Sequence, residues 1–318
     1  MENFTLLKIG KALPQLACIV IFILTLLSFF GRFPYLELAT HFRLQYLWLS
    51  IICLFFLLFS NYWTLAAITF VSILTNGVYM IPYYYPTFRE EKSVATFNLK
   101  VMTANVENKN ENYDKLIRSV KSANPDIVIL QELTAKWWEN VQSLKSDYLY
   151  SKAEPRAGGS GLAIFSRFPI ENAEIIQLDE STHPALICKI NLDGTLFSIL
   201  TIHPPTPMRN DKFIFRNKQF AGSANLLKSL PEPKLFIGDL NTTMWSPYFS
   251  DLVKDSGLRD VRVGKGLNTS WISFFPPPFR IAIDHCLVSE TIEVETVELG
   301  EFTGSDHLPL IVNLKIEK

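Results

Sequence analysis

Runs of apolar residues divide the chain into two unequal parts. The first part contains two long stretches without any charged residue or histidine, one between Lys11 and Arg32 and the other between Arg43 and Arg89. In the second part, shorter apolar runs alternate with polar and charged positions. The two patterns predict a membrane anchor at residues 1–88 and a globular domain at residues 89–318.

The first uncharged stretch is long enough for one membrane-spanning helix at residues 13–30, because about 20 apolar residues cross a bilayer. The second stretch is roughly twice that length and breaks at the polar sequence SNYW, residues 60–63. It therefore predicts two more transmembrane helices, at residues 44–59 and 64–80, joined as a tight hairpin. A cleaved signal peptide followed by a core helix is the alternative, but a signal peptide accounts for only the first stretch.

The second part shows the period-two alternation of half-buried strands, interrupted by helical patterns. Strands are predicted at residues 94–106, 126–131, 161–166, 173–178, 185–192, 195–202, 234–237, 281–288, 292–299 and 308–316. Helices are predicted at residues 113–122, 135–143, 211–229 and 247–254. Ser246 followed by Pro247 marks a helix start, since serine caps the amino end and proline suits the first turn. This mixture of strands and helices predicts a layered α/β sandwich.

Composition and charge refine this picture. The chain is 48% hydrophobic and 19% charged, which is apolar for a soluble protein. The second part carries 26 of the 30 basic and 29 of the 31 acidic residues, because four basic and two acidic residues precede it, so its net charge is −3. A general nucleic-acid binder usually has a basic surplus, so this charge weighs against a nucleic-acid partner. The four cysteines show no metal-binding spacing and are predicted to be buried thiols.

Polar residues follow or begin several of the predicted strands. They are Asn105, Glu132, His203, Asp239, Asn241, Asp284, Asp306 and His307. Strand ends in a layered α/β domain lie along one rim, so these side chains are expected to gather there. Oxygen-rich sites of this kind suit Mg²⁺, with Mn²⁺ as an alternative. An ion held by carboxylates beside histidine and asparagine can support phosphoryl transfer to water.

The motifs around these residues resemble those of the endonuclease/exonuclease/phosphatase family. In chain order they read ANV, LQE, IHP, GDLN, IDH and SDH, and the resemblance covers residues 97–313. It implies a four-layer α-β-β-α sandwich that hydrolyses phosphoric esters. The uncharged stretches, and MWSPYFSDL after GDLN, resemble the membrane-anchored bacterial subgroup that includes the teicoplanin-resistance membrane protein of vancomycin-resistance clusters. Two positions depart from the family: Ala104 stands where tryptophan is frequent, and His203 where the nucleases often carry tyrosine.

The resemblance also implies which residues hold the metal ion. Glu132 is expected to be the principal Mg²⁺ ligand, with Asn105 beside it and also near the substrate. Asp306 is expected to bind a second ion. Glu107 stands where some family members have a second metal-binding acid, so it is a further candidate ligand.

The same resemblance implies the catalytic roles. Asp239 orients or deprotonates the attacking water, and Asn241 holds that water and a phosphate oxygen. His203 and His307 donate hydrogen bonds to the charge that develops on phosphorus, and Asp284 fixes the tautomer of His307. Asp239 and Asn241 are expected on one side because Leu240 between them faces the core. His285 follows Asp284 in a strand, points to the other face and is expected to be structural.

These features together predict a membrane-anchored, Mg²⁺-dependent hydrolase of phosphoric esters, a phosphatase or phosphodiesterase acting on a lipid-linked phosphate. Two alternatives remain: a nuclease acting on DNA or RNA, and a non-catalytic binding module on a membrane anchor. The bilayer and a phosphorylated substrate are the expected partners, and no protein partner is predicted. The loop at residues 271–280 adds Phe274, Phe275 and Phe279, which either fold onto the core or stay exposed to lipid.

The expected location is the inner membrane, with several crossings. Three crossings place the amino terminus and the second domain on opposite sides. Basic residues beside the predicted spans favour a cytoplasmic domain mildly, whereas the resemblance to the resistance protein favours an outward-facing one. Large domains follow the charge rule poorly, so the outward orientation is the prediction.

Overall fold

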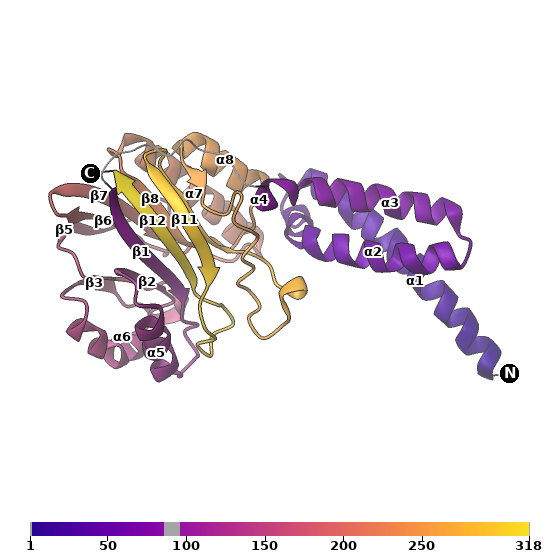
Figure 1. Cartoon of the computed structure of the whole chain (residues 1–318), viewed down its shortest axis with the longest axis horizontal. Coiled ribbons are helices and arrows are strands. Elements are labelled where there is room, and N and C mark those ends of the chain that lie inside the picture. Colours follow the sequence, from indigo (N-terminus) through magenta and orange to yellow (C-terminus); the bar gives the residue numbers. More distant parts are fainter. Residues whose placement is uncertain (1, 86–95, 318) are drawn as a thin grey trace.

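The computed structural model describes residues 2–85 and 96–317. Two six-stranded sheets form the body of the second part, and an elongated bundle of helices projects from one side of it (Figure 1). The strand orders are β11-β12-β1-β2-β4-β3 and β5-β6-β7-β8-β10-β9. Each sheet is mixed, because β1 runs parallel to β2 and β7 parallel to β8, while the other neighbours are antiparallel.

The elements have the following bounds. The first sheet contains β1 (Thr96–Asn105), β2 (Ile127–Gln131), β3 (Tyr150–Glu154), β4 (Leu162–Ser166), β11 (Ile292–Leu299) and β12 (Leu310–Glu317). The second contains β5 (Ile170–Ile176), β6 (Ala185–Leu192), β7 (Thr195–Ile202), β8 (Lys234–Asp239), β9 (Arg259–Asp260) and β10 (Asp284–Val288). The α-helices are α1 (Glu2–Leu27), α2 (Arg43–Phe59), α3 (Trp63–Val78), α4 (Ile81–Tyr84), α5 (Tyr113–Ala123), α6 (Ala135–Asn140), α7 (Asn210–Ser229) and α8 (Pro247–Ser256). Short 3₁₀ helices are η1 (Ser28–Phe30), η2 (Leu36–Phe42), η3 (Gln142–Ser146), η4 (Ala157–Gly159) and η5 (Pro277–Phe279).

Strand alternation explains how the two sheets pack. In β1, Leu99 and Val101 point into the core between the sheets, while Met102 lies in the cluster on the outer face, with residues of α5 and α6. In β8, Leu235 points into the same central core, and Phe236 lies in the outer cluster with residues of α7 and α8. The helices therefore cover the outer faces of both sheets, which is consistent with the predicted α-β-β-α sandwich.

The start of α8 follows from local chemistry. The Ser246 hydroxyl accepts a hydrogen bond from the Tyr248 amide at 3.2 Å, and Pro247 occupies the first turn. The helix ends at Gly257, whose φ of 69° is the left-handed conformation common just past a helix. The predicted start of this helix is confirmed.

The strand prediction was wrong for one boundary and missed two strands. The predicted strand at residues 281–288 begins only at Asp284, because Ile281 pairs instead with Trp271 in an isolated bridge. Strands β3 and β9 were not predicted: β3 is a half-buried edge strand and β9 has two residues, so neither shows a clear alternation. The predicted domain boundary at residues 88 and 89 lies outside the described residues.

The prediction of three transmembrane helices needs correction. Two segments, Ala12–Phe30 and Leu36–Phe59, are long and apolar enough to cross a membrane, by length and composition alone. The third helix, Trp63–Val78, is apolar but has only 16 residues. At about 1.5 Å per residue it is shorter than the hydrocarbon core of a bilayer.

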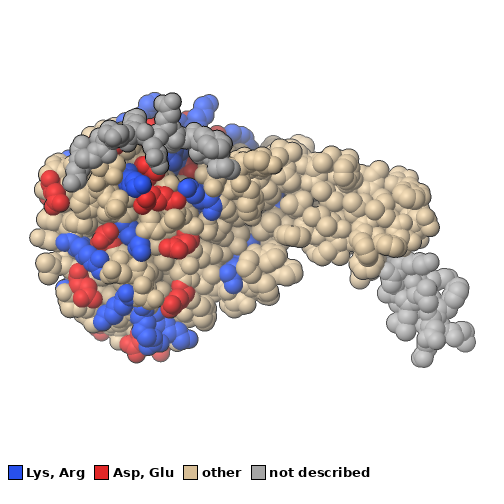
Figure 2. Space-filling view, viewed as in Figure 1, with Lys and Arg blue, Asp and Glu red and all other residues tan. Residues whose placement is uncertain are grey.

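The helical bundle carries apolar side chains on its outside and polar ones inside. Phe59 and Trp63 are 75% and 65% exposed. By contrast, Asn76 is fully buried and donates hydrogen bonds to the Thr25 hydroxyl at 3.0 Å and the Ser72 carbonyl at 2.9 Å. The visible face of the bundle is almost free of charge, whereas acidic and basic residues are mixed over the sheet domain (Figure 2). This distribution is the reverse of that in a water-soluble bundle.

The bundle packs directly against the sheet domain. Leu44 at the start of α2 and Tyr83 in α4 belong to the same apolar cluster as Phe249 of α8. The amide nitrogens of Gly264 and Gly266 donate to the carbonyl oxygens of Pro82 and Tyr83. The bundle and the domain therefore share part of one core.

Candidate active site

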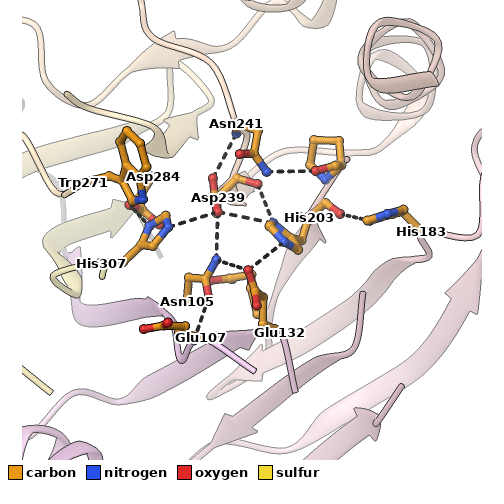
Figure 3. A network of polar contacts seen from close by, with 12 residues as sticks. Asn105, Glu107, Glu132, His183, His203, Asp239, Asn241, Trp271, Asp284 and His307 are labelled. Atoms are coloured by element: carbon orange, nitrogen blue, oxygen red, sulfur yellow. Dashed lines mark hydrogen bonds and ion pairs between the residues drawn. The ribbon is translucent and has the colours of Figure 1, made fainter. Parts of the chain in front are cut away.

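The polar strand ends meet at one rim of the sandwich, as Figure 3 shows. Asn105 ends β1 and pairs in register with Gln131, which ends the parallel strand β2 and precedes Glu132. In the second sheet, Asp239 at the end of β8 lies opposite Asp284 at the start of β10. Since β1 and β8 face each other across the sandwich, the two sheets deliver these groups to one place.

Left-handed backbone turns aim three of the side chains. Glu107, Glu132 and Asn241 have φ angles of 56°, 59° and 50°. Residues with a Cβ pay roughly 1–2 kcal/mol for this conformation, and such strain is concentrated at functional sites. Gln131, the last residue of β2, is buried and hydrogen-bonded to Thr103. The left-handed turn at Glu132 ends the strand alternation directly after it.

Gly238 permits the close approach of β7 and β8 that sets His203 beside Asp239. Its φ is 155°, and a Cβ atom there would lie 2.2 Å from the carbonyl oxygen of Ile202. The backbone of β7 therefore fills the space that a side chain would need. This explains why a glycine precedes Asp239 at the end of the apolar strand.

Asn105 connects the two sheets. Its Nδ2 donates to Oε1 of Glu132 at 3.1 Å and to Oδ2 of Asp239 at 2.9 Å. Its Oδ1 accepts from the amide of Glu107 at 2.9 Å. The backbone and side-chain nitrogens of Asn108 both donate to Oε2 of Glu132. The Glu132 carboxylate is thus held at both oxygens.

His203 lies between the two acids. Its Nε2 is 3.6 Å from Oε1 of Glu132, and its Nδ1 is 3.4 Å from Oδ2 of Asp239. Burial lowers the pKa of His203, but the charges of Asp239 and Glu132 more than offset this and raise it. Burial would raise the pKa of Glu132, yet the contacts with His203, Asn108 and Asn105 hold it at about 2. Glu132 is therefore ionised at neutral pH.

His307 and Asp284 form a second acid–histidine pair. The His307 Nδ1 lies 2.9 Å from Oδ2 of Asp284, and Ser270 donates its hydroxyl proton to the same oxygen. The His307 Nε2 is 3.7 Å from Oδ2 of Asp239. Burial lowers the pKa of His307, but Asp284 and Asp239 outweigh it and raise the value to about 10. His307 is therefore an imidazolium at neutral pH. At the neighbouring Asp239, burial raises the pKa of the carboxyl group.

Asp306 and Glu107 lie on the more exposed side. Trp271 donates its indole N–H to Oδ2 of Asp306 at 2.8 Å, and the Asp306 amide donates to Oε2 of Glu107 at 3.1 Å. Burial and the nearby charge of Asp306 raise the pKa of Glu107. The Asp306 side chain remains 33% exposed, so it borders the opening of the site.

The donor set fits a divalent cation. Five carboxylates converge here on two imidazoles, so the site is negative even when both rings are protonated. Carboxylate oxygens are the ligands that Mg²⁺ and Mn²⁺ prefer. The predicted ligands Glu132, Asn105 and Asp306 all border the site, although Asn105 turns its NH₂ group toward the acids and its oxygen toward Glu107.

Another grouping of ligand atoms is Asp239, Asp284 and His307, whose atoms lie within 4.8 Å of one another. The His307 Nδ1–H donates to Asp284, which commits both groups to a hydrogen bond and raises the pKa of the ring. This bond leaves Nε2 of the ring for another partner, so the described site offers two groups of donors, one around Glu132 and one around Asp239.

The two remaining predicted residues lie where the pattern suggested, for partly different reasons. Asn241 shares a cavity with Asp239, and Leu240 is fully buried in the outer core. However, β8 ends at Asp239, so the left-handed turn at Asn241, rather than strand alternation, returns its side chain to that side. His285 points away, toward the Thr242 carbonyl at 2.8 Å, and burial lowers its pKa to about 3.

Several residues of the site were not predicted from the sequence. Asn108, Ser270 and Trp271 each hold one of the acids, but none was among the predicted site residues. Trp271 lies in the aromatic loop at residues 271–280, for which the sequence leaves open core packing or lipid contact. Nothing in the local sequence distinguishes His41, which also borders the site.

A cavity of about 390 Å³ opens at these residues. Polar and apolar residues line it together. The polar ones include Glu132, Asp239, Asn241, Asp306 and His307, and the apolar ones are Leu38, Phe42, Pro207, Met208, Trp271, Ile281 and Ile283. The cavity therefore offers both charged and apolar contacts.

Comparison with known proteins identifies the fold. The model of the endonuclease/exonuclease/phosphatase family matches residues 96–307, two thirds of the chain. The chain belongs to this family. Its members are hydrolases of phosphoester bonds that typically use a divalent metal ion. Among curated proteins, none matches the chain significantly.

Solved structures of the family share the fold at low identity. A family protein from Bacteroides thetaiotaomicron is 18% identical with a TM-score of 0.59, over 70% of this chain and 100% of that one. A humanised TDP2 from D. rerio is 18% identical with a TM-score of 0.58, over 68% and 98%. A family protein from Beutenbergia cavernae is 15% identical with a TM-score of 0.56, over 69% and 72%.

Proposed function

We propose that this protein is a membrane-anchored, Mg²⁺-dependent hydrolase of phosphoric esters that acts on a lipid-linked phosphate. The observation that carries the proposal is the cavity of about 390 Å³, which Glu132 and Asp239 line together with apolar residues such as Leu38, Phe42 and Met208. A phosphate needs the polar residues, and an attached hydrocarbon would bury its surface against the apolar ones.

The residues support in-line attack by water. Asp239, buried and with a raised pKa, is placed to orient the water and take its proton. The imidazolium of His307 and the ring of His203 can donate to the phosphate oxygens as negative charge develops there. Mg²⁺ bound by Glu132, with Asn105 and Asp306 nearby, would neutralise phosphate charge.

The helical bundle supports a position at the membrane. Its outward apolar residues and inward polar contacts match a lipid environment, in which polar side chains pair with one another inside a bundle. Because the bundle and the domain share part of one core, the cavity would stay near the bilayer surface. Tethering raises the local concentration of any substrate that resides in the membrane.

The aromatic loop lies beside the bundle. Phe274 and Phe279 are 67% and 60% exposed, which supports the lipid-facing alternative for this loop. Gln45 in α2 donates to the carbonyl oxygens of Pro278 at 3.0 Å and Arg280 at 2.9 Å. The loop is therefore held against the amino end of a helix that is proposed to lie in the membrane.

Replacing Phe274, Phe275 and Phe279 together with serine should lower turnover of phosphatidic acid in phosphatidylcholine vesicles roughly tenfold, because lipid contact is lost. Turnover of soluble para-nitrophenyl phosphate should change little. Serine at the exposed residues Leu149 and Leu196, elsewhere on the domain, provides the matched control. Equal losses on both substrates would show that the loop serves the fold instead.

The sheet domain is proposed to face outward from an inner membrane. Protease added to spheroplasts should then degrade the domain while the membrane is intact, because the protease cannot cross the bilayer. An epitope at the carboxyl terminus, detected by immunoblotting, reports the cleavage. A domain that stays protected until detergent is added would place it in the cytoplasm.

Nuclease activity is the competing function, since one solved relative, TDP2 of D. rerio at 19% identity, is described with a single-strand DNA product. The charge argues against it here: the second part has a net charge of −3, and Figure 2 shows acidic and basic residues interspersed on the visible face.

A direct assay separates these functions. The detergent-solubilised full chain is incubated with phosphatidic acid vesicles, para-nitrophenyl phosphate and plasmid DNA, each with Mg²⁺ or with chelator. Mg²⁺-dependent release of phosphate from the vesicles supports the proposal. Cleavage of DNA alone would establish the nuclease, and phosphate release unaffected by chelator would exclude the metal.

A further inference from the structure

The segment that joins α1 to α2 is built into the sheet domain. Glu37 in η2 is buried, and its Oε2 forms an ion pair with Arg216 of α7 at 2.6 Å. The hydroxyls of Ser246 and Thr242 donate to its other oxygen. Arg216 also donates to the carbonyl oxygen of Asn241 at 3.2 Å. The ion pair therefore links this segment to the backbone of the active site itself.

This attachment places η2 in the wall of the active-site cavity. Leu38, His41 and Phe42 line the cavity together with Asp239 and His307. Leu38 and Phe42 are apolar lining residues, whereas His41 brings the one polar side chain of η2 that lines the cavity, within the part of the chain that the structure describes.

The hydrogen bonds of His41 define its tautomer. The backbone N–H of Thr243 donates to His41 Nδ1 at 3.3 Å, and the Thr243 hydroxyl lies 3.0 Å from the same nitrogen. A nitrogen that accepts from a backbone amide carries no proton, so the neutral ring bears its proton on Nε2. This Nε2 is buried and has no hydrogen-bond partner among the described residues.

We propose that His41 is a substrate-binding residue, whose Nε2–H donates a hydrogen bond to a phosphate oxygen of the ester in the cavity. The active site is then completed by the segment between the first two helices of the bundle. Buried polar groups are nearly always paired, so an unpaired donor on a residue that lines the cavity indicates where a ligand acceptor would lie. Phosphate oxygens are strong acceptors, and the inference rests on the proposed function for the identity of that ligand.

Two substitutions separate substrate binding from a structural role. In His41→Asn, the side-chain amide can occupy the Nδ1 position and keep the contact with Thr243, but nothing reaches the Nε2 position. In His41→Gln, the longer amide can place an NH₂ group near the Nε2 position and gives up the contact with Thr243. Substrate binding therefore predicts that glutamine is the better replacement, and a structural role predicts that asparagine is.

The measurement uses the full chain in detergent with Mg²⁺. We expect H41N to lower kcat/KM for para-nitrophenyl phosphate and for phosphatidic acid by roughly tenfold to a hundredfold, the usual range for a hydrogen bond to a charged group. It should weaken inhibition by inorganic phosphate by a similar factor. H41Q should stay within roughly threefold of the wild type in both measurements.

The outcomes distinguish this inference from the proposed function. Wild-type activity on the soluble ester but not on the vesicles would refute the lipid substrate and leave the comparison of H41N with H41Q intact. If neither ester is hydrolysed, calorimetric binding of inorganic phosphate gives the same comparison. The inference is overturned if H41N matches the wild type, if H41Q is the weaker variant, or if phosphate does not bind the wild type.

Discussion

Glu132→Gln is expected to lower hydrolysis of a phosphoric ester by roughly a thousandfold or more, at the upper end for one preorganised charged group. The carboxylate is ionised, with its pKa held at about 2, and both oxygens are fixed by Asn105 and Asn108. Glutamine keeps the shape but removes the charge that would hold Mg²⁺. The measurement is kcat/KM for para-nitrophenyl phosphate at saturating Mg²⁺.

Glu139→Gln is the matched control, because Glu139 is an exposed glutamate on α6. It should leave activity unchanged. Thermal unfolding should be similar for the wild type and both variants, which separates loss of the ion from loss of the fold. Hydrolysis that persists in E132Q and also in chelator would refute the metal mechanism.

Asp284→Asn and His307→Ala should each lower kcat by roughly a hundredfold to ten-thousandfold. The double variant should have nearly the same kcat as the less active of the two single variants. The two side chains are joined by a hydrogen bond of 2.9 Å. Loss of the Asp284 charge lowers the pKa of His307 from about 10 and frees the ring to adopt the wrong tautomer. When two groups act as one unit, removing either one abolishes their joint effect on kcat, so removing the second changes little.

A double-mutant cycle on kcat measures this coupling. Asp255→Asn, at an exposed aspartate of α8, serves as the control and should have no effect alone or combined with His307→Ala. Additive losses for Asp284→Asn and His307→Ala would show that the two residues act separately.

The helices and strands were largely predictable because they depend on local patterns. In β11, the buried Ile292 and Val294 alternate with the exposed Glu293, as the period-two pattern of the sequence predicts. The cap at Ser246 is equally local. Failures occurred where the local signal is weak, as in β3, or where a distant partner decides, as at Ile281, which pairs with Trp271 instead of extending β10.

The candidate residues of the site were predictable as a set, because each stands next to a predicted strand. Their connections were not. Asn105 donates to Asp239 across 134 positions of sequence, and His41 contacts Thr243 across 202. The roles assigned to these residues remain predictions, and their geometry is what the structure adds.

The sequence by itself determined the apolar stretches, the alternating strands and the polar residues at their ends, because periodicity and composition act over a few neighbouring residues. Only the tertiary structure decided that left-handed turns aim Glu132 and Asn241. It also decided that the segment joining α1 to α2 lines the cavity at the candidate active site. These features depend on how two sheets and a bundle pack, and packing joins residues that no local pattern relates.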